Sequence, residues 1–580
     1  MPASARADLR YRTEIVGVSG GDLNDLLATV SQLKALEDRP PASAAALRRR
    51  ADRDLAGLRD AAQSLGYWGA QFSYNVDSTT EPAKVVVTVT PGSLYHVDSV
   101  WVLGPDGQRL AIPGALPLPL KPGDPARTAP VLAAEAALVV RFTNSGHPFA
   151  KATARRVVID KGPMTMAVTY RIDPGPQMRF GQTRINGLDR LDPGYVERRL
   201  GWQGGETYDA AKVAATRSVL LQSGLFSTVA ITPSADPKTP GEAAMTVAVT
   251  ERAHRTIGVG LAYNTSQGAG ARAFWENRNL FGNAEYLKLD ASAGQQVDAF
   301  AANFRRPDFL STGQDLLATA EVANDTPVAY RSRRALATIG LERRFGPLLT
   351  GGASLQAETA NVEQLATLSP FTATERTQSY ELLGVPAYVK LDTTDNLLDP
   401  THGWRAQLTV TPAHTFSRPD LNFVSSLVSV STYRPVGGSD RVVLAGRLAL
   451  GSLDGAPLGE LPADQRIYAG GGGSIRPYGY QMAGALDSSN IPIGGKSSLV
   501  GNLEARIKLT PTIGLVPFID AGSFYEKSLP QFGERLFYGV GLGLRYYTPF
   551  GPLRLDLATP LYKRGADSPI QVYISLGQAF

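Results

Sequence analysis

Few residues in this 580-residue sequence form a pattern that could support catalysis. Gly495-Lys496-Ser497 matches the last residues of a phosphate-binding loop, but Asn490 stands where that loop requires glycine. The five histidines do not have the spacing of metal ligands; they are His96, His147, His254, His402 and His414. We therefore expect no enzyme activity, no metal site and no cofactor.

A single arginine, Arg476, follows a run of four glycines, Gly470–Gly473, in a long break between strand-like segments at about residues 453–497. Glycine favours neither a helix nor a strand, so this run predicts a loop. Long loops in compact proteins are usually either functional or disordered. We expect a functional loop that folds back into a β-barrel and is anchored by Arg476.

The expected partner of Arg476 is Asp520, within Phe518-Ile519-Asp520-Ala521-Gly522, on a strand predicted to face the interior. A buried guanidinium is costly unless it meets a carboxylate, and the fork of arginine suits bidentate pairing. The alternative is a solvated external loop with an ordinary surface arginine. Exchanging the charges of Arg476 and Asp520 would distinguish the two.

Composition restricts the classes of protein to consider. Hydrophobic residues make up 43% and charged residues 19% of the chain, and no apolar run reaches the roughly 18 residues of a spanning helix. A membrane role must therefore come through a β-barrel or through peripheral contact. The net charge of +5 is not gathered into a basic stripe, so we expect no nucleic-acid binding. The first residues, Met1–Ala7, lack the apolar core of a signal peptide.

The first 250 residues repeat three times. Gly66, Gly146 and Gly224 each close a helical segment, at spacings of 80 and 78 residues, and each leads into two strands. The pattern predicts strand–helix–helix–strand–strand units at residues 9–92, 93–175 and 176–251. These units resemble POTRA domains, which implies binding by strand addition at a sheet edge; the alternative is three unrelated α+β domains.

Residues 252–580 alternate with a period of two. Ile257, Val259 and Leu261 share an apolar face, and strands of about ten residues suit a tilted membrane strand. The length predicts about 16 strands. In the last segment, Gln571–Phe580, the side chains of Ile574, Leu576 and Phe580 share one face, and Gly577 would permit a kink in that closing strand.

The motifs together resemble the BamA/TamA-type superfamily of outer-membrane assembly proteins. Its glycine-rich loop motif corresponds to the segment from Gly473 through Ile475, Arg476, Pro477 and Tyr478, with proline where that family usually has glycine. Asp520 lies in its Phe-x-Asp-x-Gly strand motif. Glu276–Gly282 and Asp395–Gly403 resemble its early hairpin and mid-barrel turn. The C-terminal Phe580 resembles the signal by which such barrels are recognised for insertion.

The resemblance implies α+β POTRA repeats in the periplasm, followed by an all-β barrel in the outer membrane of a Gram-negative bacterium. Three POTRA units are typical of the TamA branch. The implied function is insertion of outer-membrane clients, autotransporters among them, with outer-membrane lipid and a TamB-like periplasmic protein as partners. The implied mechanism is a lateral gate between the first strand, about Arg255–Asn264, and the last strand. The alternative is a two-partner-secretion pore with the Arg476 loop as its plug.

Overall fold

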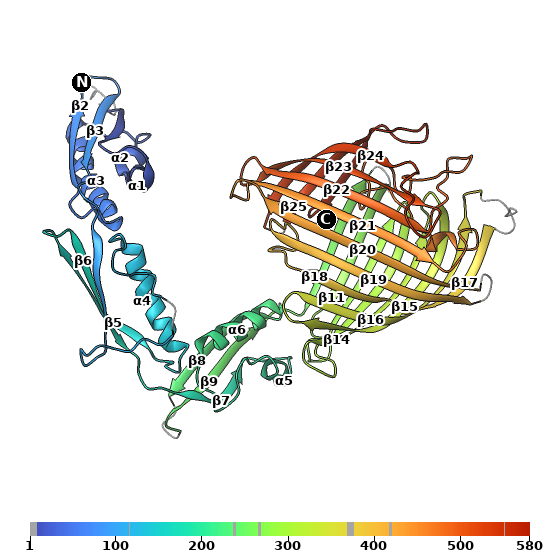
Figure 1. Ribbon diagram of the computed structural model, residues 1–580, viewed down its shortest axis with the longest axis horizontal. Coiled ribbons are helices and arrows are strands. Elements are labelled where there is room, and N and C mark those ends of the chain that lie inside the picture. Colours follow the sequence, from blue (N-terminus) through green and yellow to red (C-terminus); the bar gives the residue numbers. More distant parts are fainter. Residues whose placement is uncertain are drawn as a thin grey trace, which may run out of the picture. The chain divides into compact units, whose positions relative to one another are not determined.

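The computed structural model describes residues 9–114, 117–235, 239–264, 268–367, 376–416, 420–549 and 551–580, so Met1–Ala7 lies outside the described residues. The chain forms two compact units (Figure 1). The first contains Met1–Gly187 and Arg199–Thr250, and the second contains Leu188–Arg198 and Glu251–Phe580. No helix among the described residues is both long enough and apolar enough to cross a membrane.

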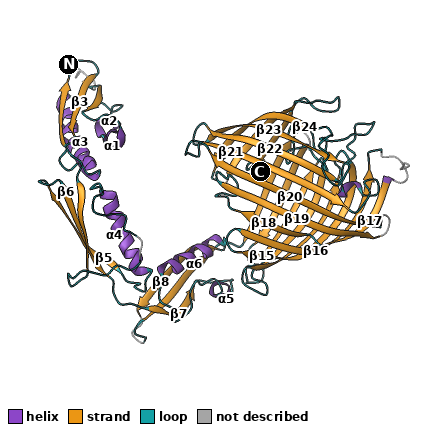
Figure 2. Ribbon diagram, in the orientation of Figure 1, coloured by secondary structure: helices purple, strands orange, loops and turns teal. Residues whose placement is uncertain are grey.

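The first unit contains three small sheets of one topology, in which the third strand lies between the first and the second. The first and third strands run parallel, and helices follow the first strand (Figure 2). The strands are β1 (Tyr11–Val16), β2 (Gln71–Asp77), β3 (Ala83–Thr90), β4 (His96–Leu103), β5 (Lys151–Asp160), β6 (Thr165–Asp173), β7 (Arg179–Asn186), β8 (Phe226–Ala235) and β9 (Glu242–Glu251). The helices of this unit are α1 (Gly21–Val30), α2 (Gln32–Ala35), α3 (Ala44–Ser64), α4 (Thr128–Thr143) and α6 (Ala210–Gln222), whereas α5 (Pro193–Glu197) belongs to the second unit. Each sheet covers its apolar face with its helices; Val85 and Val87 of β3 share a buried core with Leu47 and Leu58 of α3.

The middle repeat departs from the predicted pattern of two helices. Its described residues form one helix, α4. The connection from β4 to α4 contains Pro113, Pro117, Pro119, Pro122 and Pro125. Proline lacks an N–H donor and clashes with the preceding turn of a helix, so this connection does not form one.

The second unit is dominated by a closed antiparallel barrel with seventeen strand segments in its described residues. They are β10 (Arg255–Asn264), β11 (Gly268–Asn277), β12 (Tyr286–Gly294), β13 (Val297–Arg306), β14 (Gln314–Asp325), β15 (Tyr330–Phe345), β16 (Leu349–Gln364), β17 (Thr377–Gly384), β18 (Ala387–Asp392), β19 (Gly403–Phe416), β20 (Leu421–Pro435), β21 (Val442–Asp454), β22 (Ser497–Lys508), β23 (Ile513–Tyr525), β24 (Phe537–Thr548), β25 (Gly551–Pro560) and β26 (Gln571–Leu576). β17 and β18 occupy one position, because both pair with β16 on one side and with β19 on the other. The barrel therefore has sixteen strand positions among the described residues, and the predicted fold class is confirmed.

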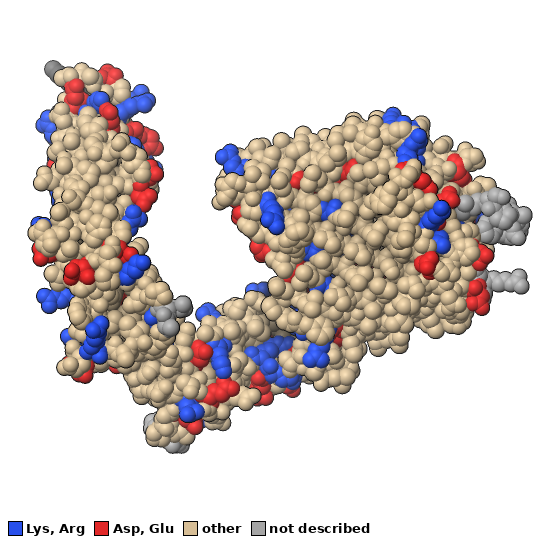
Figure 3. All heavy atoms as spheres, viewed as in Figure 1, with Lys and Arg blue, Asp and Glu red and all other residues tan. Residues whose placement is uncertain are grey.

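Side chains alternate between the outer wall and the interior of the barrel. On β24, Leu542 and Leu544 are exposed on the outer wall, whereas Gly543 and Arg545 are buried. The visible outer wall is mostly free of charged residues, which gather toward the two ends of the barrel (Figure 3). An apolar outer wall between two polar ends is the pattern of a barrel that faces lipid.

A long connection, residues 455–496, joins β21 to β22 and turns back into the barrel; we call it the lumen loop. It contains the short 3-10 helix η2 (Ala463–Gln465). The side chains of Ile475 and Tyr478 are fully buried, and that of Arg476 is 1% exposed. We call the end of the barrel where β10 begins the near end, and the opposite end, from which the lumen loop starts, the far end.

Candidate functional site

Glycines shape the part of the lumen loop that presents Arg476. Gly470 and Gly471 have φ angles of +112° and +91°, which side-chain-bearing residues rarely adopt. A Cβ atom at Gly470 would lie 2.4 Å from the carbonyl oxygen of Gly479. The amide of Gly471 donates to the carbonyl of Tyr478 at 2.9 Å, which closes the segment around Arg476.

Arg476 and Asp520 form a bidentate ion pair. Nε and Nη2 of Arg476 donate to the two Asp520 carboxylate oxygens, each at 2.8 Å, and the backbone N–H of Arg476 donates to Oδ2 at 3.0 Å. Nη1 donates to Glu504 on β22 at 2.7 Å and to Asp556 on β25 at 3.1 Å. The guanidinium carbon also lies 3.5 Å from the ring centroid of Phe518. Three strands thus hold one arginine, because their inward side chains converge on it.

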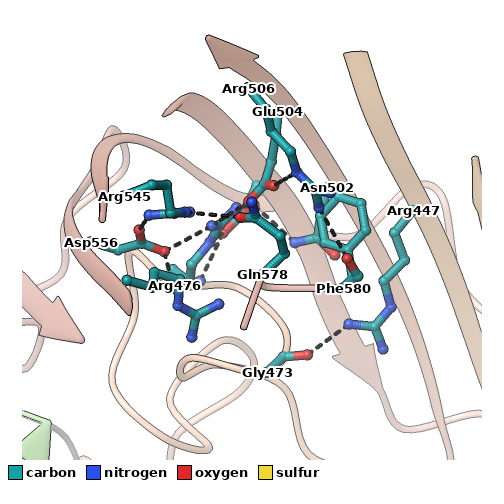
Figure 4. Close-up of polar contacts among 12 residues, drawn as sticks. Arg447, Gly473, Arg476, Asn502, Glu504, Arg506, Arg545, Asp556, Gln578 and Phe580 are labelled. Atoms are coloured by element: carbon teal, nitrogen blue, oxygen red, sulfur yellow. Dashed lines mark hydrogen bonds and ion pairs between the residues drawn. The ribbon is translucent and has the colours of Figure 1, made fainter. Parts of the chain in front are cut away.

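Three more arginines balance these carboxylates. Arg545 pairs with Asp556 at 2.5 Å and Arg506 with Glu504 at 3.0 Å (Figure 4). Nε of Arg554 lies 3.6 Å from Asp556. The side chains of Glu504, Arg545 and Asp556 are completely buried. A buried charge is tolerated when it is paired and hydrogen-bonded, so the network fixes the lumen loop against the wall.

Pro477 fits the wall of this barrel because of a glycine on β24. A Cβ atom at Gly539 would lie 2.5 Å from Cβ of Pro477. The turn hydrogen bond, 3.1 Å long, is donated by Tyr478 to the carbonyl of Ile475, so the N–H that proline lacks is not needed for it. Ile475 occupies a similar niche: its Cδ1 atom would lie 2.9 Å from a Cβ atom at Gly522.

Tyr478 and Gly473 also contact the wall. The Tyr478 hydroxyl lies 2.5 Å from the carbonyl oxygen of Tyr562 and 3.2 Å from that of Tyr538, while its ring meets Phe537 edge to face. The carbonyl of Gly473 accepts from Arg447 at 2.9 Å. A Cβ atom at Gly473 would meet nothing within 4 Å, so this glycine contributes through its backbone.

The lumen loop has a second attachment, which sequence reasoning missed. Asp464 of η2 accepts from Ser332 on β15 at 3.0 Å, and its Oδ2 lies 3.0 Å from the hydroxyl of Tyr380 on β17. Gln465 donates to Tyr380 at 2.8 Å and to Glu358 on β16 at 3.2 Å. The loop is therefore held by two separate groups of strands, β15–β17 and β21–β26.

The barrel closes through a short seam between β10 and β26. Among the described residues, Tyr263 pairs with Ile574 and Asn264 with Tyr573, which makes two residue pairs. By contrast, β10 pairs with β11 over ten residues, and β26 pairs with β25 over six. The paired part of the seam lies at the far end, and the longer near-end part of β10 does not pair with β26 among the described residues.

The predicted gate side chains lie on the outer wall beside this seam. Ile257, Val259 and Leu261 of β10 are 78%, 84% and 89% exposed, more than most apolar side chains of the barrel. Ile574 and Leu576 of β26 are 51% and 58% exposed. All five therefore face outward, on the two strands that bound the seam.

The C-terminal segment differs from its prediction as a strand that runs to Phe580. β26 ends at Leu576, and Gly577, with φ of +89°, lies beyond the strand. Phe580 turns into the barrel, where its ring lies 6.4 Å from that of Tyr433 and 5.4 Å from the Arg506 guanidinium carbon. The left-handed backbone at Gly577 takes the chain out of the ladder, and the interior contacts hold it there.

The early hairpin motif, Glu276–Gly282, contacts the segment Leu188–Arg198 within the second unit. Asn279 donates to the carbonyl of Arg190 at 3.2 Å, and the carbonyl of Gly282 accepts from Asp192 at 2.7 Å. Glu251, at the end of β9, accepts from the backbone N–H groups of residues 189–191 and lies 2.8 Å from His254. These contacts fix the segment beside the start of β10.

Glu504, Asp556 and Tyr573 are the residues of the arginine site that sequence reasoning did not assign. All three are polar residues at buried, inward positions of their strands. The two-residue alternation of side chains along each strand could have identified these positions as interior. It could not have paired them with Arg476, because each lies 28 or more residues away in the chain.

Comparison with known proteins places this architecture in a family. Residues 279–580 match the Omp85 superfamily domain, and residues 178–252 match a POTRA repeat described as a surface antigen variable number repeat. The chain is 26% identical over 432 residues to the outer membrane protein assembly factor BamA of Nitratidesulfovibrio vulgaris, covering 71% of this chain and 53% of that protein. It is 21% identical to BamA of Neisseria meningitidis, covering 91% of this chain and 72% of that protein. The chain thus spans about half the length of the first relative.

Among solved structures, BamA from Haemophilus ducreyi lacking POTRA domains 1–3 has the same fold. The TM-score is 0.68 at 18% identity, and the match covers 83% of this chain and 99% of that one. The barrel lies in the outer membrane and the POTRA region in the periplasm, so the near end is periplasmic and the far end extracellular. Since the family domain matches more than half of the chain, the protein belongs to the Omp85 superfamily.

Proposed function

We propose that the protein is an outer-membrane assembly factor that inserts β-barrel clients through its β10–β26 seam. The observation that carries the proposal is the seam itself, which has two residue pairs among the described residues, whereas β10 and β11 share ten. A net hydrogen bond contributes about 1 kcal/mol, so this seam opens at a far lower cost than any fully paired neighbour. The names of the two BamA relatives support the proposal.

The near-end part of β10 offers the pairing edge that such a mechanism needs. A strand edge without a neighbour presents free N–H and C=O groups that another strand can pair with. The outward side chains Ile257, Val259 and Leu261 continue the apolar outer wall at this edge, in contact with outer-membrane lipid. A client strand that pairs here would enter the bilayer with its backbone groups satisfied.

The periplasmic sheets supply a second kind of contact. β5 lies at the edge of its sheet, and eight of its ten residues are exposed, Val157 and Val158 among them. Strand addition to such an edge suits an unfolded client or a long β-rich periplasmic protein. The three repeated sheets match the number typical of TamA, so the function we propose is TamA-like, with autotransporters among the clients and a TamB-like partner.

A disulfide across the seam tests the function. The chain contains no cysteine, and Tyr263 and Ile574 are direct partners, so Tyr263→Cys with Ile574→Cys forms one defined bond. We expect the oxidised double variant to lose client insertion in proteoliposomes and the reduced form to regain it. The two single-cysteine variants are the controls. A fully crosslinked barrel that still inserts clients would overturn the lateral mechanism.

The same experiment separates the rival function, a pore that exports one cognate protein through the lumen. Such a pore needs the lumen loop to leave the barrel. Glu504, Asp520 and Asp556 would then lose their ion pairs with Arg476. Locking the seam would not obstruct export through the lumen. The pore would be favoured if the crosslinked barrel still exported its cognate protein and if neither the oxidised nor the reduced form inserted clients.

A further inference from the structure

Tyr573 on β26 connects the seam strand directly to the lumen loop. Its side chain is 4% exposed and faces the interior. The hydroxyl donates to the carbonyl oxygen of Arg476 at 3.0 Å and lies 3.4 Å from that of Tyr478. A hydroxyl has one hydrogen, so the shorter contact, with Arg476, is the main hydrogen bond.

Tyr573 is paired on both sides in the β-ladder, so its hydrogen bond to the lumen loop connects the loop to two neighbouring strands. Tyr573 is opposite Asn264 across the seam, and opposite Asp556 on β25. Asp556 accepts from the guanidinium of Arg476 at 3.1 Å. Arg476 is thus held through its side chain by β25 and through its carbonyl by β26. The loop residue that is fixed in the wall also holds the strand that must move.

The contact is closely packed on both sides. A Cβ atom at Gly472 of the lumen loop would lie 2.9 Å from Cδ1 of Tyr573, so the ring lies in space that only glycine leaves free. In the part of the chain that the structure describes, the seam is paired at its far end alone, and Tyr573 takes part in one of the two pairs there. The tether therefore acts at the place where β10 and β26 still meet.

We infer that the Tyr573 hydroxyl is a latch that keeps the seam closed at its extracellular end by tying β26 to the lumen loop. The inference rests on the proposed function and adds a contact that regulates the opening of the seam. When a client strand pairs with β10 from the periplasmic side, opening the rest of the seam requires either that this hydrogen bond breaks or that the lumen loop moves with β26. Opening of the seam and the position of the Arg476 network are then coupled.

Tyr573→Phe tests the latch, because it removes the hydroxyl and keeps the ring. Cysteines at Leu261 and Leu576, which face outward on either side of the seam, carry nitroxide labels in the otherwise cysteine-free chain in liposomes. The readout is the distribution of distances between the labels, measured by pulsed electron resonance without any client. We expect the ratio of open to closed seam to rise about fivefold, the change that loss of one net hydrogen bond produces.

Tyr388→Phe is the matched control. It removes another hydroxyl bond of the barrel interior, from Tyr388 on β18 to Glu342, away from the seam. A general loosening of the barrel would change both variants alike, whereas a latch changes only Tyr573→Phe. Equal distributions for the Tyr573 variant and the parent would overturn the latch.

Gly472→Ala approaches the same contact from the loop and keeps the inference testable if Tyr573→Phe folds poorly. The added methyl group displaces the ring and its hydroxyl, so we expect the same shift toward the open seam; an unchanged seam would contradict the latch. These distances are measured without clients, so a failed latch leaves the assembly function standing. The failure of that function would appear only in the disulfide experiment on client insertion.

Discussion

At the scale of single residues, Arg476 shows how one buried charge can organise a loop. Its guanidinium meets three carboxylates, Glu504, Asp520 and Asp556, and stacks on Phe518. Arginine suits this place because its planar fork donates along several fixed directions and stays charged when buried. The expectation of a single Arg476–Asp520 pair was therefore too simple.

Removing Arg476 should destabilise the barrel strongly. Arg476→Ala removes the cation that three buried carboxylates share and takes the ion-pair partner from Asp520, and breaking a buried pair from one side costs about 3–5 kcal/mol. The measurement is the urea midpoint of unfolding in lipid. Arg331→Ala, which breaks an exposed pair with Glu363 on the outer face, is the control and should change little.

Exchanging the charges should not rescue the site. In Arg476→Asp with Asp520→Arg, the new aspartate on the loop faces Glu504 and Asp556, which stay in place. We expect the double variant to be no more stable than either single variant. Recovery of the parent's midpoint would show that Asp520 alone carries the anchor.

At the scale of elements, the junction between β9 and β10 rests on one carboxylate. Burial raises the pKa of the Glu251 carboxyl, but the N–H groups of Asp189, Leu191 and Arg190, together with His254, outweigh this and hold the pKa below its usual 4.5. A carboxyl whose pKa is lower in the folded state stabilises that state above its unfolded pKa. That stabilisation is lost as the pH falls through the folded value.

Acid should therefore release the segment Leu188–Arg198. Below about pH 4.5, amide hydrogens at residues 189–191 should exchange faster than the pH dependence of free amides predicts. In Glu251→Gln, the amide hydrogens at residues 189–191 should exchange fast already at neutral pH, and their exchange should lose most of this pH dependence. Glu14→Gln, at an exposed pair with Lys84, is the control. Protection that is equal in parent and Glu251→Gln would contradict the role of the carboxylate.

At the scale of the whole molecule, the barrel combines a lipid-facing wall, a filled interior and one weak seam. Sixteen strand positions among the described residues close the wall, and the lumen loop is bound to β15–β17 and to β21–β26. The lumen loop is thus attached to the wall directly beside the seam. In the function that we propose, opening is directed sideways into the bilayer, because the lumen loop stays attached inside the barrel.

The position of the lipid band along the wall can be tested on one strand. Leu542 and Tyr546 both face outward on β24, Leu542 at its middle and Tyr546 toward the near end. Arginine on the lipid face costs about 2–4 kcal/mol at the bilayer midplane and about 0–1 kcal/mol at the interface. Leu542→Arg should therefore lower the urea midpoint far more than Tyr546→Arg. Equal decreases of the urea midpoint in the two variants would show that the lipid band is not centred near Leu542.

The sequence alone determined the features that depend on near neighbours. A period of two predicts strands wherever it occurs, because successive side chains of a strand point to opposite faces; β10, β24 and β25 follow from it. The repeated glycines mark the three α/β repeats, and the glycine run marks the lumen loop. The long loop and the interior position of Asp520 were enough to suggest Asp520 as the partner of Arg476.

Only the tertiary structure decided what meets inside the closed barrel. Glu504 and Asp556 reach Arg476, and Asp464 reaches Tyr380, because ring closure brings distant strands around one interior. The end of β26 at Leu576 and the short seam likewise depend on how many residues find a partner across the ring. Alternation assigns a side chain to a face, whereas register and closure assign its partner, and these are set by pairings between distant parts of the chain.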